Sequence, residues 1–450
     1  MINYLEKINN KFLFNRKKNK MFNFRYNLLA ILQISLSIIN SILLIRLFGV
    51  SYQTDSYLMA IGIITALQLL QLMTVEQFMY FYHDLKVKNV EEAHNFYRSV
   101  ITYGVIVGMI TFIILWPGVN FILDIFAHNL DPLRLNLLKS ILIILIVGLI
   151  FNPMNYVNQR LLNAEMKFSL PYLLDSLYFF FISISLIYIL FSNNVNILFL
   201  AYANVLGLLI AFILGFILVK REGISIKPKR YHHLMNKFVK NSFSMKFGHN
   251  IHNILFTPVT NNILALLPIG YASYFYYAQM IVVGITFIVT GPQYRVLLSN
   301  VSTLWAEKKL NTIKTMIKEY LKLFLPLLIV SSAVTYFFIP TILEFISSGK
   351  LTFIDLTYIQ MVFLGLAVWY IIIMAEGAFV SVGMASKNSK IFILTNSIFI
   401  FVYFTLSLLL VQSLGIFAIP VAAVIGQLIN FIFYSNYAFK ILRINIFWRK

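Results

Sequence analysis

Five ionisable side chains stand inside or at the edges of long apolar segments of this 450-residue chain: Arg46, Asp55, Glu76, Asp175 and Glu376. A charge at the centre of a bilayer costs about 2.5–3.5 kcal/mol on insertion scales. Each of these side chains is therefore expected to have a structural or functional role. Glu76 and Glu376 could bind a proton or sodium ion, or pair with basic residues. Arg46 could meet an anionic head group in a cavity or extend to the lipid surface. Asp55 and Asp175 begin expected helices, where a carboxylate complements the helix dipole.

The segment 243–267 is the most polar of these apolar segments. His249 and His252 are three residues apart, which places both on one face of a helix beside Asn253. Two histidines without a third ligand at a clear spacing make a poor metal site, and no metal is expected. The polar face either lines a wet cavity or bonds to neighbouring helices. The absence of cysteine excludes thiol catalysis and disulfides.

Helices that cross a membrane must position these side chains. The chain is 60% hydrophobic and only 12% charged, whereas an average soluble domain is roughly 25% charged. A bilayer core about 30 Å thick needs about 20 helical residues. We therefore expect an all-α polytopic membrane protein with about twelve transmembrane helices. The expected spans lie near 27–48, 56–82, 97–126, 136–157, 171–191, 196–219, 243–267, 271–294, 317–339, 355–383, 391–412 and 415–439.

The distribution of Lys and Arg predicts the orientation of these helices. If the N-terminus is cytoplasmic, the outer side keeps only four of the 36 basic residues: Arg46, Arg134, Lys139 and Lys350. Cytoplasmic loops of membrane proteins carry an excess of Lys and Arg, so both termini are expected in the cytoplasm. The net charge of +20 is then explained by basic residues that orient the helices in the membrane. No nucleic-acid partner is therefore expected.

Short segments that recur at nearly one spacing predict two related halves. The pairs are 40–49 with 261–270, Lys167 with Lys387, and Gly207 with Gly426. Two six-helix halves of the same orientation imply a pseudo-two-fold axis along the membrane normal, with a cavity between the halves. The expected organisation is an N-terminal six-helix bundle over 1–219, a basic cytoplasmic linker over 220–242, and a C-terminal six-helix bundle over 243–450.

Two segments carry a resemblance to a known superfamily. Residues 46–60, Arg-Leu-Phe-Gly-Val-Ser-Tyr-Gln-Thr-Asp-Ser-Tyr-Leu-Met-Ala, resemble the junction of the first two helices in MurJ/MviN-type lipid II flippases. Wzx-type O-antigen flippases carry looser versions of this junction. Residues 269–278, which include Tyr277, are similar to the start of the eighth MurJ helix. Both families belong to the multidrug/oligosaccharidyl-lipid/polysaccharide (MOP) exporter superfamily. The chain departs from the MurJ pattern at 71–76 and 278–279, where basic residues are absent.

The resemblance implies a MATE/MOP-like fold and a transporter rather than an enzyme. Such a protein flips a lipid-linked oligosaccharide, a polyprenyl-pyrophosphate saccharide such as lipid II or an O-antigen unit, from the inner to the outer leaflet by alternating access. It implies a monomer among the lipids of the bacterial cytoplasmic (inner) membrane, with no cofactor beyond a coupling ion, H⁺ or Na⁺. A MATE-like exporter of small cationic molecules remains the alternative. The candidate cavity residues are Arg46, Asp55, Glu76, Asp175, His249, His252, Asn253, Tyr277 and Glu376.

Overall fold

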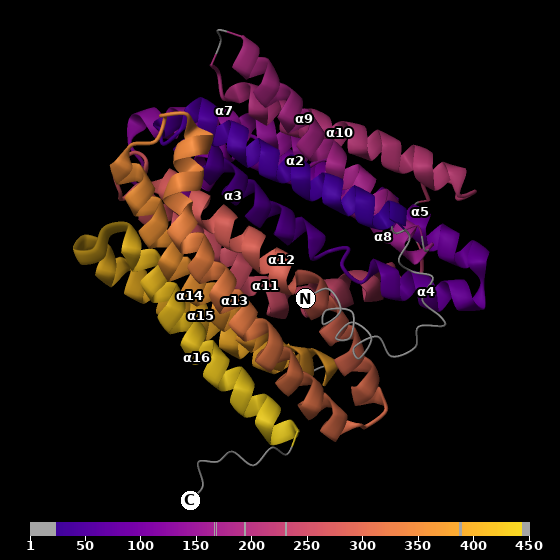
Figure 1. The fold of residues 1–450 in the computed structure, drawn as a ribbon. Coiled ribbons are helices and arrows are strands. Elements are labelled where there is room, and N and C mark those ends of the chain that lie inside the picture. Colours follow the sequence, from indigo (N-terminus) through magenta and orange to yellow (C-terminus); the bar gives the residue numbers. More distant parts are fainter. Residues whose placement is uncertain are drawn as a thin grey trace, which may run out of the picture.

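The computed structural model describes residues 24–165, 167, 169–192, 195–229, 232–386 and 389–442. Within these residues the regular structure is helical and contains no strand (Figure 1). The helices are α2 (Phe24–Phe48), α3 (Tyr52–Leu72), α4 (Phe78–Lys88), α5 (Val90–Leu115), α6 (Val119–Phe126), α7 (Pro132–Gly148), α8 (Asn152–Ala164), α9 (Ser169–Phe191), α10 (Leu198–Arg221), α11 (Met235–Ala265), α12 (Tyr271–Ala306), α13 (Leu310–Ser347), α14 (Phe353–Ala385), α15 (Ser389–Leu414) and α16 (Ala418–Ile441), with a 3₁₀ turn at Gly415–Phe417.

The helices have the length and composition of membrane spans. Eight helical segments of the described residues are long and apolar enough to cross a membrane, and the bent pair of α7 and α8 adds a ninth. One of the eight, Lys390–Ile441, contains both α15 and α16. Each of the twelve expected spans overlaps one helix or two consecutive helices. The predicted all-α membrane fold is confirmed.

Three of the expected spans are interrupted rather than continuous. The span predicted over 56–82 divides into α3 and α4, and the span over 97–126 divides into α5 and α6. In the third, α7 meets α8 at an angle of 45°. Pro117 lies between α5 and α6, and Pro153 is the second residue of α8. Proline has no N–H to donate to the preceding turn, which explains the second and third breaks.

A side chain joins the break between α3 and α4 to the bend between α7 and α8. The Gln71 side-chain amide donates to the Leu149 carbonyl oxygen at 3.1 Å. The Asn152 side-chain amide donates to the Gln71 amide oxygen at 3.2 Å. Polar groups exposed by an interrupted helix are costly in a membrane unless they are paired. The two breaks therefore stabilise each other.

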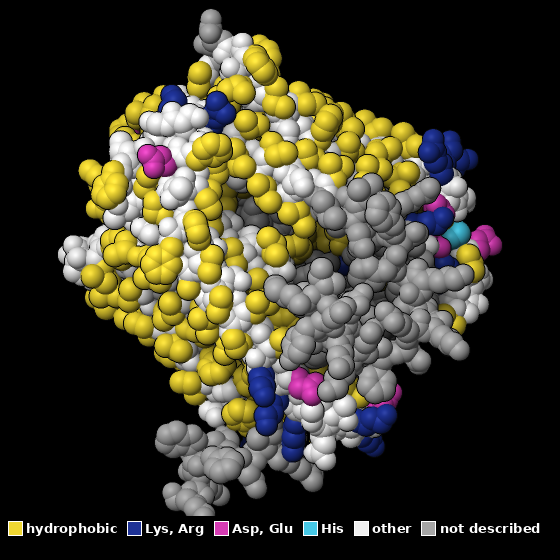
Figure 2. Space-filling view, viewed as in Figure 1, with side chains coloured by type: hydrophobic (Ala, Val, Ile, Leu, Met, Phe, Trp, Pro, Cys, Tyr) yellow, Lys and Arg dark blue, Asp and Glu magenta, His cyan; other side chains and the backbone are white. Residues whose placement is uncertain are grey.

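The helices form two bundles that lie side by side (Figure 1). In the first bundle, α9 packs against α2 and α10, while α7 packs against α3 and α10. In the second bundle, α14 packs against α12, α13 and α16, and α15 packs against α16. Helix α11 contacts both bundles, through α15 on one side and α3 on the other. Hydrophobic side chains are widespread over the described part of the face shown in Figure 2, and charged side chains lie near its margins.

The buried core is shared by the bundles at one end and divided at the other. One cluster contains residues of both bundles, including Ile63 and Leu142 of the first and Phe275 and Ile359 of the second. A second cluster holds only residues of α3–α5, α8–α10, the linker and the start of α11. A third holds only residues of the second bundle. In the part of the chain that the structure describes, the bundles are thus packed together where the first cluster lies and have separate cores beyond it.

The connection between the bundles lies against the first bundle. Ile224, which follows α10, is 2% exposed and belongs to the first bundle's separate core. Helix α11 begins at Met235, so its first turns fall inside the linker predicted over 220–242. Phe238 in those turns packs edge-on against Phe81 and Phe96, with ring centroids 5.6 and 5.3 Å away. Aromatic packing thus holds the start of α11 on the first bundle.

Candidate functional site

Asp55 is fully buried where the two bundles meet. Its carboxylate accepts hydrogen bonds from the Gly270 N–H at 2.7 Å, the Ser273 N–H at 2.8 Å and the Ser273 hydroxyl at 2.5 Å. These donors stand at the N-terminus of α12, in the other bundle. A carboxylate at a helix N-terminus pairs with free N–H groups and complements the helix dipole. Asp55 therefore caps α12 as well as lying in the first turn of its own helix α3.

Arg134 supplies the positive charge beside Asp55 and is 3% exposed. Its guanidinium lies 3.5 Å from the Asp55 carboxylate and donates to the Leu267 carbonyl oxygen at 2.9 Å. It also bonds the side chain of Asp131, which caps the N-terminus of α7. Burial alone would raise the pKa of Asp131. The hydrogen bonds from Arg134 and the positive charge of that residue outweigh burial and lower this pKa. Arg134 was not among the candidates chosen from the sequence. It is one of only four basic residues on the expected outer side, and this unusual position could have indicated a functional or structural role.

Tyr277 and Gly49 complete the contact between the bundles. The buried Tyr277 hydroxyl donates to the Gly49 carbonyl oxygen at 2.7 Å. Gly49 has φ +55°, and a Cβ there would lie 3.1 Å from the Lys350 carbonyl oxygen. A left-handed conformation and this close approach both favour glycine. We call Gly49, Asp55, Arg134, Ser273 and Tyr277 the interbundle junction; it lies at the end that the Lys and Arg distribution assigns to the outer face.

A cavity of about 330 Å³ with several polar side chains in its walls lies among the helices of the first bundle. Its walls come from α2, α3, α8, α9 and α10. Asp175 lines it and accepts a hydrogen bond from the Gln159 side-chain amide at 2.7 Å. The cavity carries six side-chain amides: Gln33, Gln68, Asn152, Asn155, Gln159 and Asn204. So many polar groups in an apolar bundle indicate a site for water, an ion or a polar ligand.

Glu76 lies in the turn between α3 and α4, not within a continuous span. The Tyr156 hydroxyl donates to its carboxylate at 2.5 Å. Arg160 donates to the same hydroxyl at 2.7 Å, and its guanidinium carbon lies 4.6 Å from the centre of the Tyr156 ring. The structure therefore links Glu76 to the basic residue Arg160 through a tyrosine, and its role in binding a proton or an ion stays a prediction.

Glu376 lies inside the second bundle, on α14, and is 7% exposed. The Gln427 side-chain amide donates to it at 2.5 Å. The Trp369 indole N–H in turn donates to the Gln427 amide oxygen at 3.0 Å. These contacts place Glu376 in a network within one bundle, apart from the interbundle junction.

The remaining candidates are not brought to the junction. Arg46 is exposed in the last turn of α2, and the described residues offer it no ion pair. His249, His252 and Asn253 belong to α11, but their side chains lie outside the part that the structure describes. Their proposed cavity-facing role stays a prediction.

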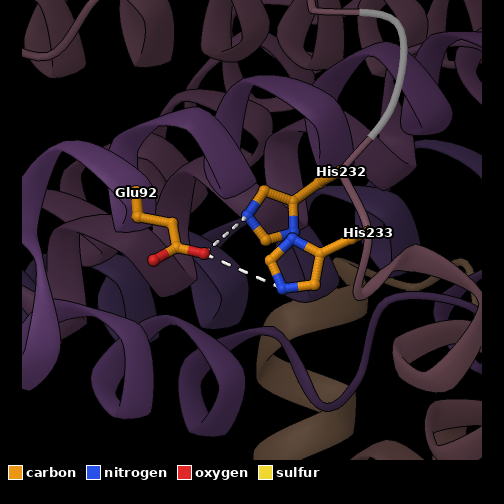
Figure 3. Close-up of side chains that lie close together, drawn as sticks. All are labelled: Glu92, His232 and His233. Atoms are coloured by element: carbon orange, nitrogen blue, oxygen red, sulfur yellow. Dashed lines mark ion pairs between the residues drawn. The ribbon is translucent and has the colours of Figure 1, made fainter.

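Glu92, His232 and His233 form a cluster that the sequence did not suggest (Figure 3). The Nε2 atoms of both histidines lie 3.8 Å from one Glu92 carboxylate oxygen. Such donors can hold a divalent metal. However, His232 Nδ1 accepts a hydrogen bond from the Leu234 N–H at 3.3 Å, whereas a metal-bound histidine normally donates from its second nitrogen. The geometry instead favours a cluster that fastens the linker to the start of α5.

Comparison with known families identifies similar proteins along nearly the whole chain. The family model described as lipid II flippase MurJ matches residues 44–447. No curated protein matches the sequence at a significant level.

Solved structures show the same fold at low sequence identity. A lipid II flippase MurJ in an inward closed conformation has a TM-score of 0.76 and 18% identity, covering 92% of this chain and 87% of its own. An inward-facing multidrug resistance MATE transporter of the MOP superfamily has a TM-score of 0.71 and 14% identity, covering 92% and 96%. A MOP superfamily transporter from Pyrococcus furiosus has a TM-score of 0.62 and 13% identity, covering 93% and 95%.

Proposed function

The chain belongs to the MurJ lipid II flippase family, and from this premise we propose that it flips a lipid-linked oligosaccharide from the inner to the outer membrane leaflet. It is a multi-pass membrane protein whose family handles a peptidoglycan precursor. A transporter of this kind needs no catalytic residues. We place it as a monomer in the bacterial inner membrane, with both termini in the cytoplasm as the distribution of Lys and Arg predicts.

The observation that carries this proposal is the division of the core. The bundles share one core at the interbundle junction and have separate cores at the other end. In alternating access, two bundles rock about a central site. One state of such a transporter is expected to have the bundles in contact at one face of the membrane and apart at the other. With the orientation above, the divided end faces the cytoplasm, where a lipid-linked precursor enters. The buried charges of the junction close the outer end.

The saccharide head is expected to enter between the bundles while its lipid tail remains in the bilayer. Arg46, exposed in the last turn of α2 at the outer end, is proposed to meet the anionic diphosphate once that end opens. The absence of cysteine from the chain permits a direct test, because introduced cysteines will be the only thiols. Ser41 of α2 and Met280 of α12 face each other across the bundles, with the hydroxyl oxygen 3.8 Å from the sulfur.

The test is a cross-link between the bundles in the double variant Ser41→Cys with Met280→Cys. Flipping of a fluorescent polyprenyl-pyrophosphate saccharide is measured in proteoliposomes before and after addition of a short thiol cross-linker with a reducible disulfide. We expect transport to stop after cross-linking, because the outer end can no longer open, and to return after reduction. The matched control is Tyr336→Cys with Met361→Cys, whose hydroxyl oxygen and sulfur lie 3.9 Å apart within the second bundle. Cross-linking that pair should leave transport unchanged.

Continued transport by the fully cross-linked Ser41–Met280 pair would contradict opening of the outer end during transport. A wild-type protein that moves organic cations but no lipid-linked saccharide would contradict the flippase proposal itself. That result would favour a MATE-like exporter.

A further inference from the structure

An apolar groove of about 780 Å³ opens on the surface of the first bundle. Helices α7, α9 and α10 supply its walls, and Trp116, just after α5, adds to them. Helix α10 packs against both α7 and α9. Among the lining side chains, Trp116, Ile184, Tyr188, Tyr202 and Leu206 are 45–58% exposed. On a chain that spans a membrane, exposed apolar side chains of this kind face hydrocarbon, so the groove is open to the chains of membrane lipids.

Aromatic side chains mark one end of the groove as the membrane surface. Tyr188 lies in the last turn of α9, and Phe199 and Tyr202 lie in the first turns of α10. The rings of Tyr188 and Phe199 pack edge-on, with centroids 5.5 Å apart. Tyrosine and tryptophan gather at the level of lipid head groups, and the distribution of Lys and Arg assigns this end to the outer face. From Tyr188 to Phe181 the groove follows α9 for about 10 Å, most of one leaflet of a hydrocarbon core about 30 Å thick.

One face of α7 changes from polar to apolar where the groove begins. Asn136 and Ser140 are exposed, and Lys139 is half-buried. Ile143 and Ile144, one turn farther from the outer end, line the groove. Residues three and four apart on a helix are neighbours on its surface, so these five side chains form one continuous strip. The strip has the order of an amphiphilic lipid, with polar groups at the outer end and apolar groups below them.

Lys139 gives the polar end of this strip a positive charge. The ion pairs described for α7 join Arg134 to Asp55 and Asp131, and none of the described ion pairs involves Lys139. The described residues that line the groove carry no charge. A lysine extends its apolar stem along such a surface and places its ammonium at the level of the head groups. An ammonium without a protein carboxylate beside an apolar groove matches a lipid whose head group carries a net negative phosphate.

We propose that this groove binds one acyl chain of an anionic phospholipid from the outer leaflet, with the phosphate of that lipid at Lys139. The described residues that line the groove all belong to the first bundle. A flipped saccharide lipid would pass between the bundles, so a resident phospholipid is the occupant that this position favours. The site goes beyond the flippase function and does not require it.

The test uses brominated acyl chains, which quench tryptophan fluorescence on contact, because Trp116 lines the groove. The chain has four tryptophans, so Trp305→Phe, Trp369→Phe and Trp448→Phe together leave Trp116 as the reporter. The full chain with these changes is reconstituted in phosphatidylcholine vesicles that contain brominated phosphatidylglycerol or brominated phosphatidylcholine at equal fractions. We expect phosphatidylglycerol to bind in the groove about fivefold more tightly than phosphatidylcholine, the factor for one lysine near a membrane surface.

Variants of the reporter chain separate the head-group contact from the groove itself. Lys139→Gln should bring the ratio of the two affinities to about one, and Lys139→Arg should keep the preference. Lys350→Gln removes an exposed lysine of the outer side in the second bundle and should leave the ratio unchanged. Ala203→Phe places a ring in the groove and should reduce quenching by both lipids, whereas Ala333→Phe at an exposed position of α13 should not.

Folding of each variant is verified by its Tm in phosphatidylcholine vesicles, and the lysine variants decide the question if Ala203→Phe unfolds. Equal quenching by the two lipids in the reporter chain would overturn the proposal. An undiminished preference in Lys139→Gln would place the head group elsewhere and overturn it too. Unlabelled polyprenyl phosphate that relieves the quenching more strongly than the same amount of unlabelled phosphatidylglycerol would assign the groove to an isoprenoid chain instead.

Discussion

The carboxylate of Asp55 joins two helices that belong to different bundles. Its two oxygens accept three short hydrogen bonds from Gly270 and Ser273, and Arg134 lies beside it. Charged hydrogen bonds that are fully buried are strong when every partner is present. Removal of one partner from a buried charged pair leaves the other unpaired, which costs about 3–5 kcal/mol.

Asp55→Asn tests this role at the residue scale. The amide nitrogen of Asn would face N–H donors of α12, and the Arg134 charge would lose its partner. We expect a clear drop in Tm and a loss of transport of about tenfold or more, since the outer end no longer closes firmly. Asp84→Asn is the control, because Asp84 forms an exposed ion pair with Lys88 at 3.2 Å. Such a pair is worth under about 1 kcal/mol. Equal effects of the two substitutions would refute a special role for Asp55.

The linker between α10 and α11 shows how an element without regular structure can be fixed in place. Arg98 of α5 donates to the Lys227 carbonyl oxygen at 2.6 Å, and the Lys229 N–H donates to the Thr102 hydroxyl oxygen at 3.2 Å. His232 is buried against Phe96, with ring centroids 5.3 Å apart. Burial, followed by the nearby His233 charge, lowers the pKa of His232 from its ordinary 6.5, although the Glu92 carboxylate works in the opposite direction.

This shift predicts that acid weakens the docking of the linker. Docked His232 takes up a proton less readily than undocked His232. Its contribution to the stability of the docked linker is therefore fully present above pH 6.5 and is lost as the pH falls below this value. Hydrogen exchange of residues 222–229 and 232–234, corrected for the intrinsic rate, should rise between pH 7.5 and 5.5. His232→Phe keeps an aromatic ring without the titration and should remove that rise, whereas His83→Phe at an exposed site should not. Exchange that stays constant with pH in the wild type would contradict the argument.

The sequence predicted helices better than it predicted their interruptions and partners. Runs of apolar residues about 20 long determine where α9, α10 and α14 lie, because the bilayer sets their length. The break after α3 depends on Gln71 meeting Leu149, a contact between distant segments that no local pattern displays. Asp55 was recognisable as a candidate, but its partner Gly270 is 215 residues away. The two-half repeat stays a prediction, although Gly49 and Gly270 both have positive φ, +55° and +96°.

At the scale of the molecule, the two bundles share a core at one end and have separate cores at the other. The bundles are therefore easier to separate at the end with separate cores. Among the described residues, the separate cores contain none from the opposite bundle, apart from the start of α11, which lies in the core of the first. Closing the divided end would bury apolar surface there, while opening the junction would expose Asp55 and Arg134 to water. Hydration then compensates for part of the lost hydrogen bonds. Such a balance lets a bound substrate or ion shift the population by its differential affinity for the two states.

Rocking predicts opposite changes of distance at the two ends. Spin labels on cysteines replacing Asn136 of α7 and Lys350 after α13 report the junction end, and labels replacing Lys88 of α4 and Lys440 of α16 report the divided end; all four sites are exposed. When a lipid-linked saccharide is added, the distance between the first pair should lengthen while that between the second pair shortens, measured by pulsed electron spin resonance. Labels on Lys350 and Lys440, which both belong to the second bundle, should show an unchanged distance. Parallel changes at both ends would indicate that the bundles separate or swell as a whole, and rocking about a central site would be excluded.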